Sequence, residues 1–476
     1  MADRAALTHV PRPGAVVAVL ALAGMGASFM QTIVVPIQSE LPDLLDASRE
    51  DTAWVITITL LVSAICTPIS GKLGDMYGKR RIAMILLVLL VIGAVVSALA
   101  PSIVPMIIGR GLQGASMGVI PLGISILRDT QHPKRLGPSI ALVSATLGVG
   151  GALGLPISAI ITEHFDWHIL FWVAGGIGAV TLLLFGLIVP PSTLRTAGRF
   201  DLVGAIGLAI GLTGVLITVS KGNEWGWTAP ATLISGGVGL LALVLWGLYE
   251  LRTVNPLVDL RVSARGPVLM TNLASVAMGF ALFSSNIVFP QLLELPPSTG
   301  GLGLPLLAAS LILMPAGLAM LVISPIAGRL INRIGPKPML AIGGLILAGT
   351  YGAALLVPAS VWSIALVNTA IGIGIGFGYA AMPTLIMRAV PASETGAANG
   401  LNTLMRSLGT SFAAAAVAAV LAQSATAESG GLPTAAGFQT ALLFGLVAAA
   451  ICAVLALLIP QPKASPEAHP SLPPTA

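Results

Sequence analysis

The sequence is poor in charge, in aromatic residues and in cysteine. Of its 476 residues only 9% are charged and 5% aromatic, whereas 56% are hydrophobic and the mean hydropathy is +0.96. Soluble globular proteins carry about 25% charged residues, so this composition excludes a soluble protein. The two cysteines, Cys66 and Cys452, both lie in apolar runs. They are predicted to be packing residues rather than a disulfide or a pair of metal ligands.

Sequence motifs for nucleotide binding and for catalysis are also missing. The chain contains no Gly-Lys-[Ser/Thr] phosphate loop, which excludes direct ATP drive within it, and no catalytic constellation stands out. His164 and His168 lie four residues apart beside Glu163 and Asp166. This spacing suits a metal site or a proton relay, and the alternative is a polar turn at a membrane surface. We predict that the chain is not an enzyme and has neither a cofactor nor a metal site.

Long apolar runs dominate what is present. A helix needs about 20 apolar residues to cross the hydrocarbon layer, and continuous rather than alternating runs select helices over a barrel. The sequence therefore predicts an all-α polytopic membrane protein with fourteen spans. They are 14–37, 51–71, 81–100, 103–127, 136–161, 168–190, 201–220, 229–250, 266–294, 304–327, 338–357, 360–386, 398–422 and 437–460.

Basic residues fall almost entirely on one side of these spans. Of the 23 Lys and Arg residues, 19 lie in segments on the side of the N-terminus; Arg49 and Lys221 lie on the other, and Arg110 and Arg406 within spans. The positive-inside rule then places both termini in the cytoplasm. The net charge of +5 thus reflects topology and indicates no nucleic-acid partner. The tail 463–476 is predicted to be disordered.

A charged stretch occurs twice. GKLGDMYGKRR (71–81) aligns with GRLINRIGPKP (328–338) at an offset of 257, and Asp75 aligns with Asn332. Such repeats are typical of transporters built from two related halves around a central site. We interpret both stretches as cytoplasmic turns that latch a gate, with Asp75 paired to a base across it; the alternative is a generic basic loop. The gate residues are Gly71, Asp75, Gly78, Lys79, Arg80, Gly328, Arg329, Arg333 and Gly335.

The first of these stretches resembles the signature loop of the major facilitator superfamily, and fourteen spans resemble its drug:proton antiporter branch. IGRGLQGASMG (108–118), AWVITITLL (53–61) and the stretch 372–409 resemble further motifs of that branch. The resemblance implies two six-helix bundles, 1–196 and 263–462, with an inserted helix pair at 197–262. It also implies an antiporter-type glycine motif, carried here by Gly150, Gly154 and Pro156.

The chain departs from that branch at two places. In MQTIVVP (30–36), Met30 replaces the usual first-span acid and Val35 the usual Asn. In GGALGLP (150–156), the proline comes one residue late. The first departure removes the acid through which the branch is expected to couple protons.

Ionisable side chains at membrane depth are costly, so Arg110 and Arg406 are candidates for function; the alternative is snorkelling to the interface. If both face the central cavity, its fixed charge is positive, which favours neutral or anionic amphiphiles. The residues predicted to couple substrate and protons are Gln31, Arg110, Gln113, Glu163, Asp166, Glu294, Asn402 and Arg406.

Aromatic area mixed with a few polar groups is typical of a pocket for amphiphiles, although small polar residues also join helices in lipid. The predicted pocket residues are Trp54, Phe280, Phe283, Ser285, Asn286, Phe289 and Tyr379.

These patterns predict a secondary transporter that exports amphiphilic small molecules by alternating access, driven by the proton gradient. We expect a monomer in a bacterial cell membrane, with the bilayer and the substrate as its partners. Two alternatives remain open: an uncoupled facilitator or uptake carrier, and a lipid-moving or receptor-like protein on the same fold.

Overall fold

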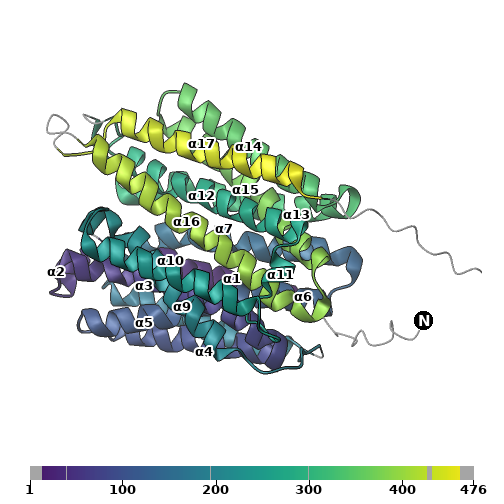
Figure 1. Ribbon diagram of the computed structural model, residues 1–476. Helices are drawn as coiled ribbons and strands as arrows, with labels where there is room; N and C mark the ends of the chain where they lie inside the picture. The colour runs from purple at the N-terminus through teal and green to yellow at the C-terminus, as the bar shows by residue number, and fades with distance from the viewer. Residues whose placement is uncertain (1–12, 39, 193, 298–299, 426–430, 461–476) are drawn as a thin grey trace, which may run out of the picture.

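The computed structural model describes the chain except residues 1–12, 39, 193, 298–299, 426–430 and 461–476. The predicted tail 463–476 lies outside the described residues. Regular structure in the described part is helical (Figure 1), and fourteen helical segments in it are long and apolar enough to cross a membrane, as predicted.

Most spans are single helices. They are α1 (Pro13–Thr32), α3 (Arg49–Tyr77), α4 (Lys79–Ala98), α7 (Pro133–His164), α8 (His168–Ile188), α9 (Leu202–Trp225), α10 (Pro230–Glu250), α12 (Gly266–Glu294), α13 (Leu306–Ile334), α14 (Pro336–Leu356), α15 (Val361–Ala389), α16 (Thr395–Ser424) and α17 (Ala435–Leu458). The fourth span consists of α5 (Ile103–Ala115) and α6 (Val119–Thr130), joined by one 3₁₀ turn. Two short helices, α2 (Leu41–Leu44) and α11 (Leu260–Ser263), lie outside the spans.

The spans form two halves. Helices α1 and α3 to α8 pack together, as do α12 to α17, while α9 and α10 pair with each other and lie along the seam (Figure 1). Each half has its own apolar core. Helix α10 keeps its apolar side chains outward; Leu233 and Leu240 are each 61% exposed. Such a surface suits lipid, whose chains are as apolar as a protein core.

The two repeated stretches, which we predicted to be turns, are helical except at one glycine in each. Helix α3 continues to Tyr77 and α4 begins at Lys79, so Gly78 alone makes the turn, with φ +105°. In the second copy Gly335 does the same between α13 and α14, with φ +89°. Only glycine adopts such angles at little cost, which explains why it recurs at this place in the repeat. Asp75 and Asn332 therefore lie on helices, one turn before each break.

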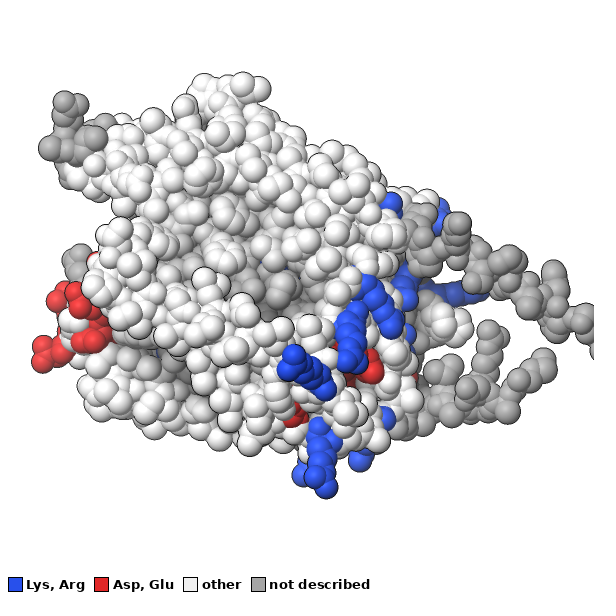
Figure 2. All heavy atoms as spheres, in the orientation of Figure 1, with Lys and Arg blue, Asp and Glu red and all other residues white. Residues whose placement is uncertain are grey.

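Basic residues are concentrated at one end of the bundle, where a few acidic residues lie among them (Figure 2). Lys and Arg gather at the end where α3, α6 and α13 finish, called here the basic end. A cluster of Asp and Glu marks the opposite end, called here the acidic end, around α2 and the close of α7. The first predicted span stops early at this end: α1 finishes at Thr32 rather than 37, and turns follow up to Gln38, in a stretch that contains Pro36.

Candidate functional site

At the basic end the two halves touch directly where α3 meets α16. A Cβ added to Gly71 would come within 2.4 Å of the Gly396 carbonyl oxygen, so the two backbones are in contact. Beside this contact the Asp75 carboxylate accepts hydrogen bonds from the N–H groups of Gly396 (3.0 Å) and Ala397 (2.8 Å). The first N–H groups of a helix have no partner within it and favour a negative charge. Asp75 therefore pairs with the start of α16 and not, as predicted, with a base.

The second contact between the halves joins α7 and α13. A Cβ on Gly137 would lie 2.9 Å from the Gly328 carbonyl oxygen, which indicates another close backbone approach. The Asn332 Nδ2 donates to the Lys134 carbonyl oxygen at 2.8 Å. Asp75 and its repeat partner Asn332 thus each bond from their own half to the other, Asp75 as acceptor and Asn332 as donor. The repeat predicted this symmetry, although not the partners.

The loop before α9 adds to the basic-end contact. The Thr196 N–H donates to the Asp75 carbonyl oxygen and its hydroxyl donates to the Ser393 carbonyl oxygen, both at 2.8 Å. Because Asp75 and Ser393 belong to different halves, Thr196 joins them. Arg128 also reaches the second half, donating to the carbonyl oxygens of Val390 and Pro391 at 3.4 Å.

Four predicted gate bases do not bridge the halves. Lys79, with a fully buried side chain, pairs with Asp129 at 2.8 Å, and Arg80 donates to the Gly186 carbonyl oxygen at 2.5 Å. Both contacts lie within the first half, where they join α4 to α6 and α8. Arg329 and Arg333 are exposed at the end of α13. The structure therefore separates these four bases from the contact itself, to which Asp75, Asn332, Thr196 and Arg128 contribute side-chain bonds.

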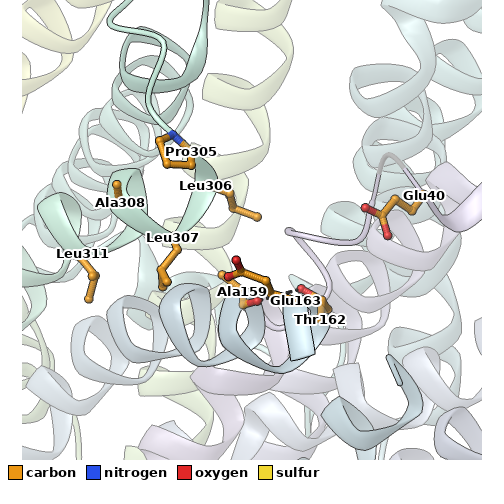
Figure 3. A pocket seen from close by; sticks show the side chains of 9 residues that line it. All are labelled: Glu40, Ala159, Thr162, Glu163, Pro305, Leu306, Leu307, Ala308 and Leu311. Atoms are coloured by element: carbon orange, nitrogen blue, oxygen red, sulfur yellow. Dashed lines mark hydrogen bonds between the residues drawn. The ribbon is translucent and has the colours of Figure 1, made fainter. Parts of the chain in front are cut away.

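At the acidic end the halves part around a cleft of about 470 Å³ (Figure 3). The end of α7 forms one wall with Ala159, Thr162 and Glu163, and the start of α13 faces it. Glu40 lies on the far side of the opening. The two charged residues that line the cleft are thus acids. A volume of this size can hold a small organic molecule.

Of the predicted coupling acids, only Glu163 lines this cleft. Asp166 lies outside the spans, where it accepts bonds from the backbone N–H of His168 at 2.8 Å and from its ring at 2.5 Å. These bonds hold the pKa of Asp166 below its ordinary value. Glu294 is exposed at the end of α12, away from the cleft lining.

Arg110 does not face a cavity, contrary to the prediction. Its side chain is 1% exposed, and its guanidinium donates to the carbonyl oxygens of Met30 (2.7 Å) and Val55 (3.3 Å) and to Oε1 of Gln113 (2.7 Å). Arg110 therefore ties α5 to α1 and α3 inside the first half. Gln31, predicted beside it, is half-buried one residue after Met30.

The second half has a comparable polar interior. Arg406 lies over the ring of Tyr379 with 4.6 Å to the centroid, a cation–π contact. Asn402 is 2% exposed and donates to Asn272 Oδ1 (2.9 Å) and Ser275 Oγ (2.7 Å). These bonds join α16 to α12 within one half, so the position of Asn402 is that of a packing contact.

The predicted pocket in α12 is not a single surface. Phe289 is 2% exposed in the core of the second half, and Ser285, 1% exposed, bonds to the Leu282 carbonyl oxygen. Asn286 is exposed, whereas Phe280 and Phe283 are half-buried. A helix turns successive residues through its whole circumference, so one stretch cannot line one cavity throughout. Trp54 lies instead near the acidic end, with the Lys221 ammonium 5.6 Å from its ring.

The glycine motif of α7 packs against α1. A Cβ on Gly150 would lie 2.4 Å from the Met25 carbonyl oxygen, and one on Gly154 would lie 2.0 Å from Thr32 Oγ1. Pro156 is buried inside α7. Small residues here allow the two helix backbones to approach closely.

Two buried acidic residues were not among the residues predicted from the sequence. Asp201 and Glu250, 8% and 2% exposed, lie at the basic end of the helix pair α9 and α10. Oxygens of both lie within 2.5 Å of where a Cβ on Gly204 would sit. The signal in the sequence was an acid at the edge of each apolar run, and such acids are usually solvated.

Two bundles of membrane helices, in contact at one end and parted at the other, define a polytopic transporter. Residues 20–414 match the Major Facilitator Superfamily, and the chain belongs to that family. It is 26% identical over 467 residues to the lincomycin resistance protein LmrB of Listeria monocytogenes serovar 1/2a, covering 95% of this chain and 98% of that one. It is also 26% identical over 419 residues to the multidrug resistance protein Stp of Mycobacterium tuberculosis strain CDC 1551 / Oshkosh, covering 85% and 76%.

Other relatives agree on the family. The uncharacterized MFS-type transporter YhcA of Bacillus subtilis is 26% identical over 334 residues, which are 69% of this chain but only 61% of that protein. The human organic anion transporter MFSD10 (TETRAN) superposes with a TM-score of 0.64 at 15% identity, covering 94% and 100% of the two chains. The proton:xylose symporter XylE gives 0.63 at 16%, covering 92% and 94%. These structures show the shared fold.

Proposed function

We propose that this transporter exports amphiphilic small molecules across the cytoplasmic membrane by alternating access, in exchange for protons. The observation that carries the proposal is the asymmetry between the two ends of the bundle. The halves meet at the basic end through Gly71, Asp75 and Asn332, and part at the acidic end around the cleft beside Glu163.

Orientation gives this asymmetry a direction. By the positive-inside rule the basic end lies in the cytoplasm, so the cleft opens outward. A transporter of two rocking halves in this state has released an exported molecule and is ready to accept a proton from outside. Relatives named for multidrug and lincomycin resistance support export as the physiological direction.

The charge of the cleft refines the substrate. Arg110 lies buried within the first half and adds no positive surface, whereas Glu40 and Glu163 line the cleft. A cleft lined by carboxylates attracts cations and repels anions. Neutral and cationic amphiphiles are therefore favoured over anionic ones. The expectation of neutral or anionic substrates required both arginines to face the cavity, and Arg110 does not.

The test uses everted membrane vesicles that contain the overexpressed chain and carry a dye for internal pH. After the interior is acidified, cationic, neutral and anionic amphiphiles are added in turn. A rise in internal pH with a cationic or neutral compound is expected, and it should be smaller in vesicles with Asp75→Asn at equal abundance. Accumulation of the compound without proton movement would refute exchange.

A second candidate is a facilitator without proton coupling. It is favoured by one observation: the position of the missing first-span acid is Met30, which is 1% exposed with its carbonyl oxygen occupied by Arg110. In the same vesicles a facilitator would equilibrate a labelled compound and never concentrate it.

A further inference from the structure

A second cavity of about 450 Å³ lies between the two halves at the basic end. Three basic residues line it, Lys134 and Arg135 at the start of α7 and Arg329 near the end of α13. Its apolar lining includes Val17 of α1 and Leu142 of α7. The cavity therefore combines positive charge with apolar surface, and both halves contribute to it.

The three cations have no acidic partner in the part of the chain that the structure describes, where the ion pairs within 4.0 Å involve other residues. All three side chains are exposed. Like charges gathered in a cavity repel one another and attract an anion. The charge of this cavity thus selects an anionic ligand.

The cavity also meets the lipid-facing surface of α13. Leu318, Val322 and Ile326 are 40%, 64% and 45% exposed and follow one another at helical spacing. Arg329 comes three residues later and continues the same face. An arginine at the end of an apolar membrane face lies at the level of the lipid headgroups.

We propose that this cavity binds the phosphate-bearing headgroup of an anionic phospholipid from the cytoplasmic leaflet. Arg135 and Arg329 can hold phosphate oxygens through paired N–H groups, and Lys134 adds a third positive charge. The acyl chains lie along Leu318, Val322 and Ile326. Free phosphate would satisfy the three cations equally well, but it would leave the apolar surface without a ligand.

Bound lipid has a conformational consequence. The cavity lies beside the Gly137–Gly328 contact. Lys134 and Arg329 line the cavity from different halves. When the halves part at the basic end, these cations separate and the site is lost. A ligand that binds only one state stabilises that state, so anionic lipid favours the form closed at the basic end. This inference holds whichever substrate is transported.

The direct test counts bound lipids on the purified full chain by native mass spectrometry, with phosphatidylglycerol and phosphatidylcholine offered in turn. We expect selective retention of phosphatidylglycerol. The triple variant Lys134→Gln/Arg135→Gln/Arg329→Gln should lower its apparent affinity by on the order of a hundredfold, since each of the three basic residues near a membrane surface contributes a factor of roughly five. The matched control Arg81→Gln/Arg252→Gln/Arg388→Gln removes three exposed basic residues from the same end and should retain the lipid.

Three results would overturn the proposal: equal retention of both lipids, equal loss in the two triple variants, or displacement of phosphatidylglycerol by millimolar inorganic phosphate. The last would assign the cavity to soluble phosphate. A second measurement keeps the residues that line the cavity intact, so that a folding defect of the triple variant cannot affect its result. Spin labels at Tyr77→Cys and Ala392→Cys should report a larger closed fraction in nanodiscs with phosphatidylglycerol than in phosphatidylcholine alone, and an unchanged fraction would contradict the proposal.

Discussion

The carboxylate of Asp75 on α3 accepts the backbone N–H of Gly396, at the start of α16, across the boundary between the two halves. Asp75 is 1% exposed and also accepts the N–H of Ala397. A charged acceptor at a helix start is stronger than a neutral one. This contact therefore acts as a latch that holds the basic end closed.

Replacing Asp75 with Asn should weaken this latch. Asn keeps one acceptor oxygen but loses the charge, and a hydrogen bond to a charged group contributes about 2 kcal/mol. The population should shift about thirtyfold toward the form open at the basic end, which spin labels at Tyr77→Cys and Ala392→Cys would measure. Folding and abundance should be retained. A variant with normal distances and normal transport would show that Asp75 is not the latch.

Replacing Gly71 with Ala should separate the same two helices. The added Cβ would lie 2.4 Å from the Gly396 carbonyl oxygen, and backbone cannot yield as a flexible side chain can. Transport should fall severely while the chain still inserts in the membrane. The matched control is Gly176→Ala on α8, where an added Cβ has nothing within 4 Å. Equal transport in both variants would contradict close approach at Gly71.

Replacing Lys79 with Ala should destabilise the first half. Its fully buried ammonium pairs with Asp129, and removing one partner of a buried ion pair costs about 3–5 kcal/mol because the other charge is left uncompensated. A lower melting temperature in detergent is the expected result. The double variant Lys79→Met/Asp129→Leu removes both charges and should recover most of the loss. If the double variant is no more stable than Lys79→Ala, the pair is not the cause.

Replacing Glu163 with Gln should reduce proton exchange, because Glu163 is the predicted coupling acid that lines the cleft. Its neighbour Asp166 serves as the control. Hydrogen bonds from His168 depress the pKa of Asp166, so it keeps its charge above its ordinary pKa of about 4 and loses that charge only at more acid pH. Between pH 5 and 8, Asp166→Asn should leave the pH profile of transport unchanged. If Asp166→Asn shifts the pH profile of transport and Glu163→Gln does not, then Asp166 rather than Glu163 couples protons.

The fold could be predicted from the sequence because the patterns that indicate it extend over the whole chain. Apolar runs of sufficient length predicted fourteen spans, and the 257-residue offset predicted equivalent positions such as Gly78 and Gly335. It could not reveal side-chain direction within a span. Arg110 and Phe289 were expected to face a cavity, yet Arg110 is buried inside the first half and Phe289 inside the second. In lipid a polar or aromatic side chain is equally well placed between helices or in a pocket, and only the packing decides.

The partners across the gate were equally hidden. A base was expected opposite Asp75, because acidic side chains commonly form ion pairs with basic ones. The actual partners are the backbone N–H groups of Gly396 and Ala397, which every non-proline residue carries and no sequence pattern marks. The acidic cleft depends on segments as distant as Glu40 and Leu307, so its lining follows from the assembled structure.

If the two ends of the bundle open in alternation, two distances measured in the same molecules must change in opposite directions. After replacement of Cys66 and Cys452, spin labels at Thr162→Cys and Leu307→Cys report the acidic end, and labels at Tyr77→Cys and Ala392→Cys report the basic end. On addition of a transported compound we expect a shorter distance across the cleft and a longer one across the gate, in the same fraction of molecules. Distances that stay fixed, or that lengthen together, would contradict alternating access in this chain.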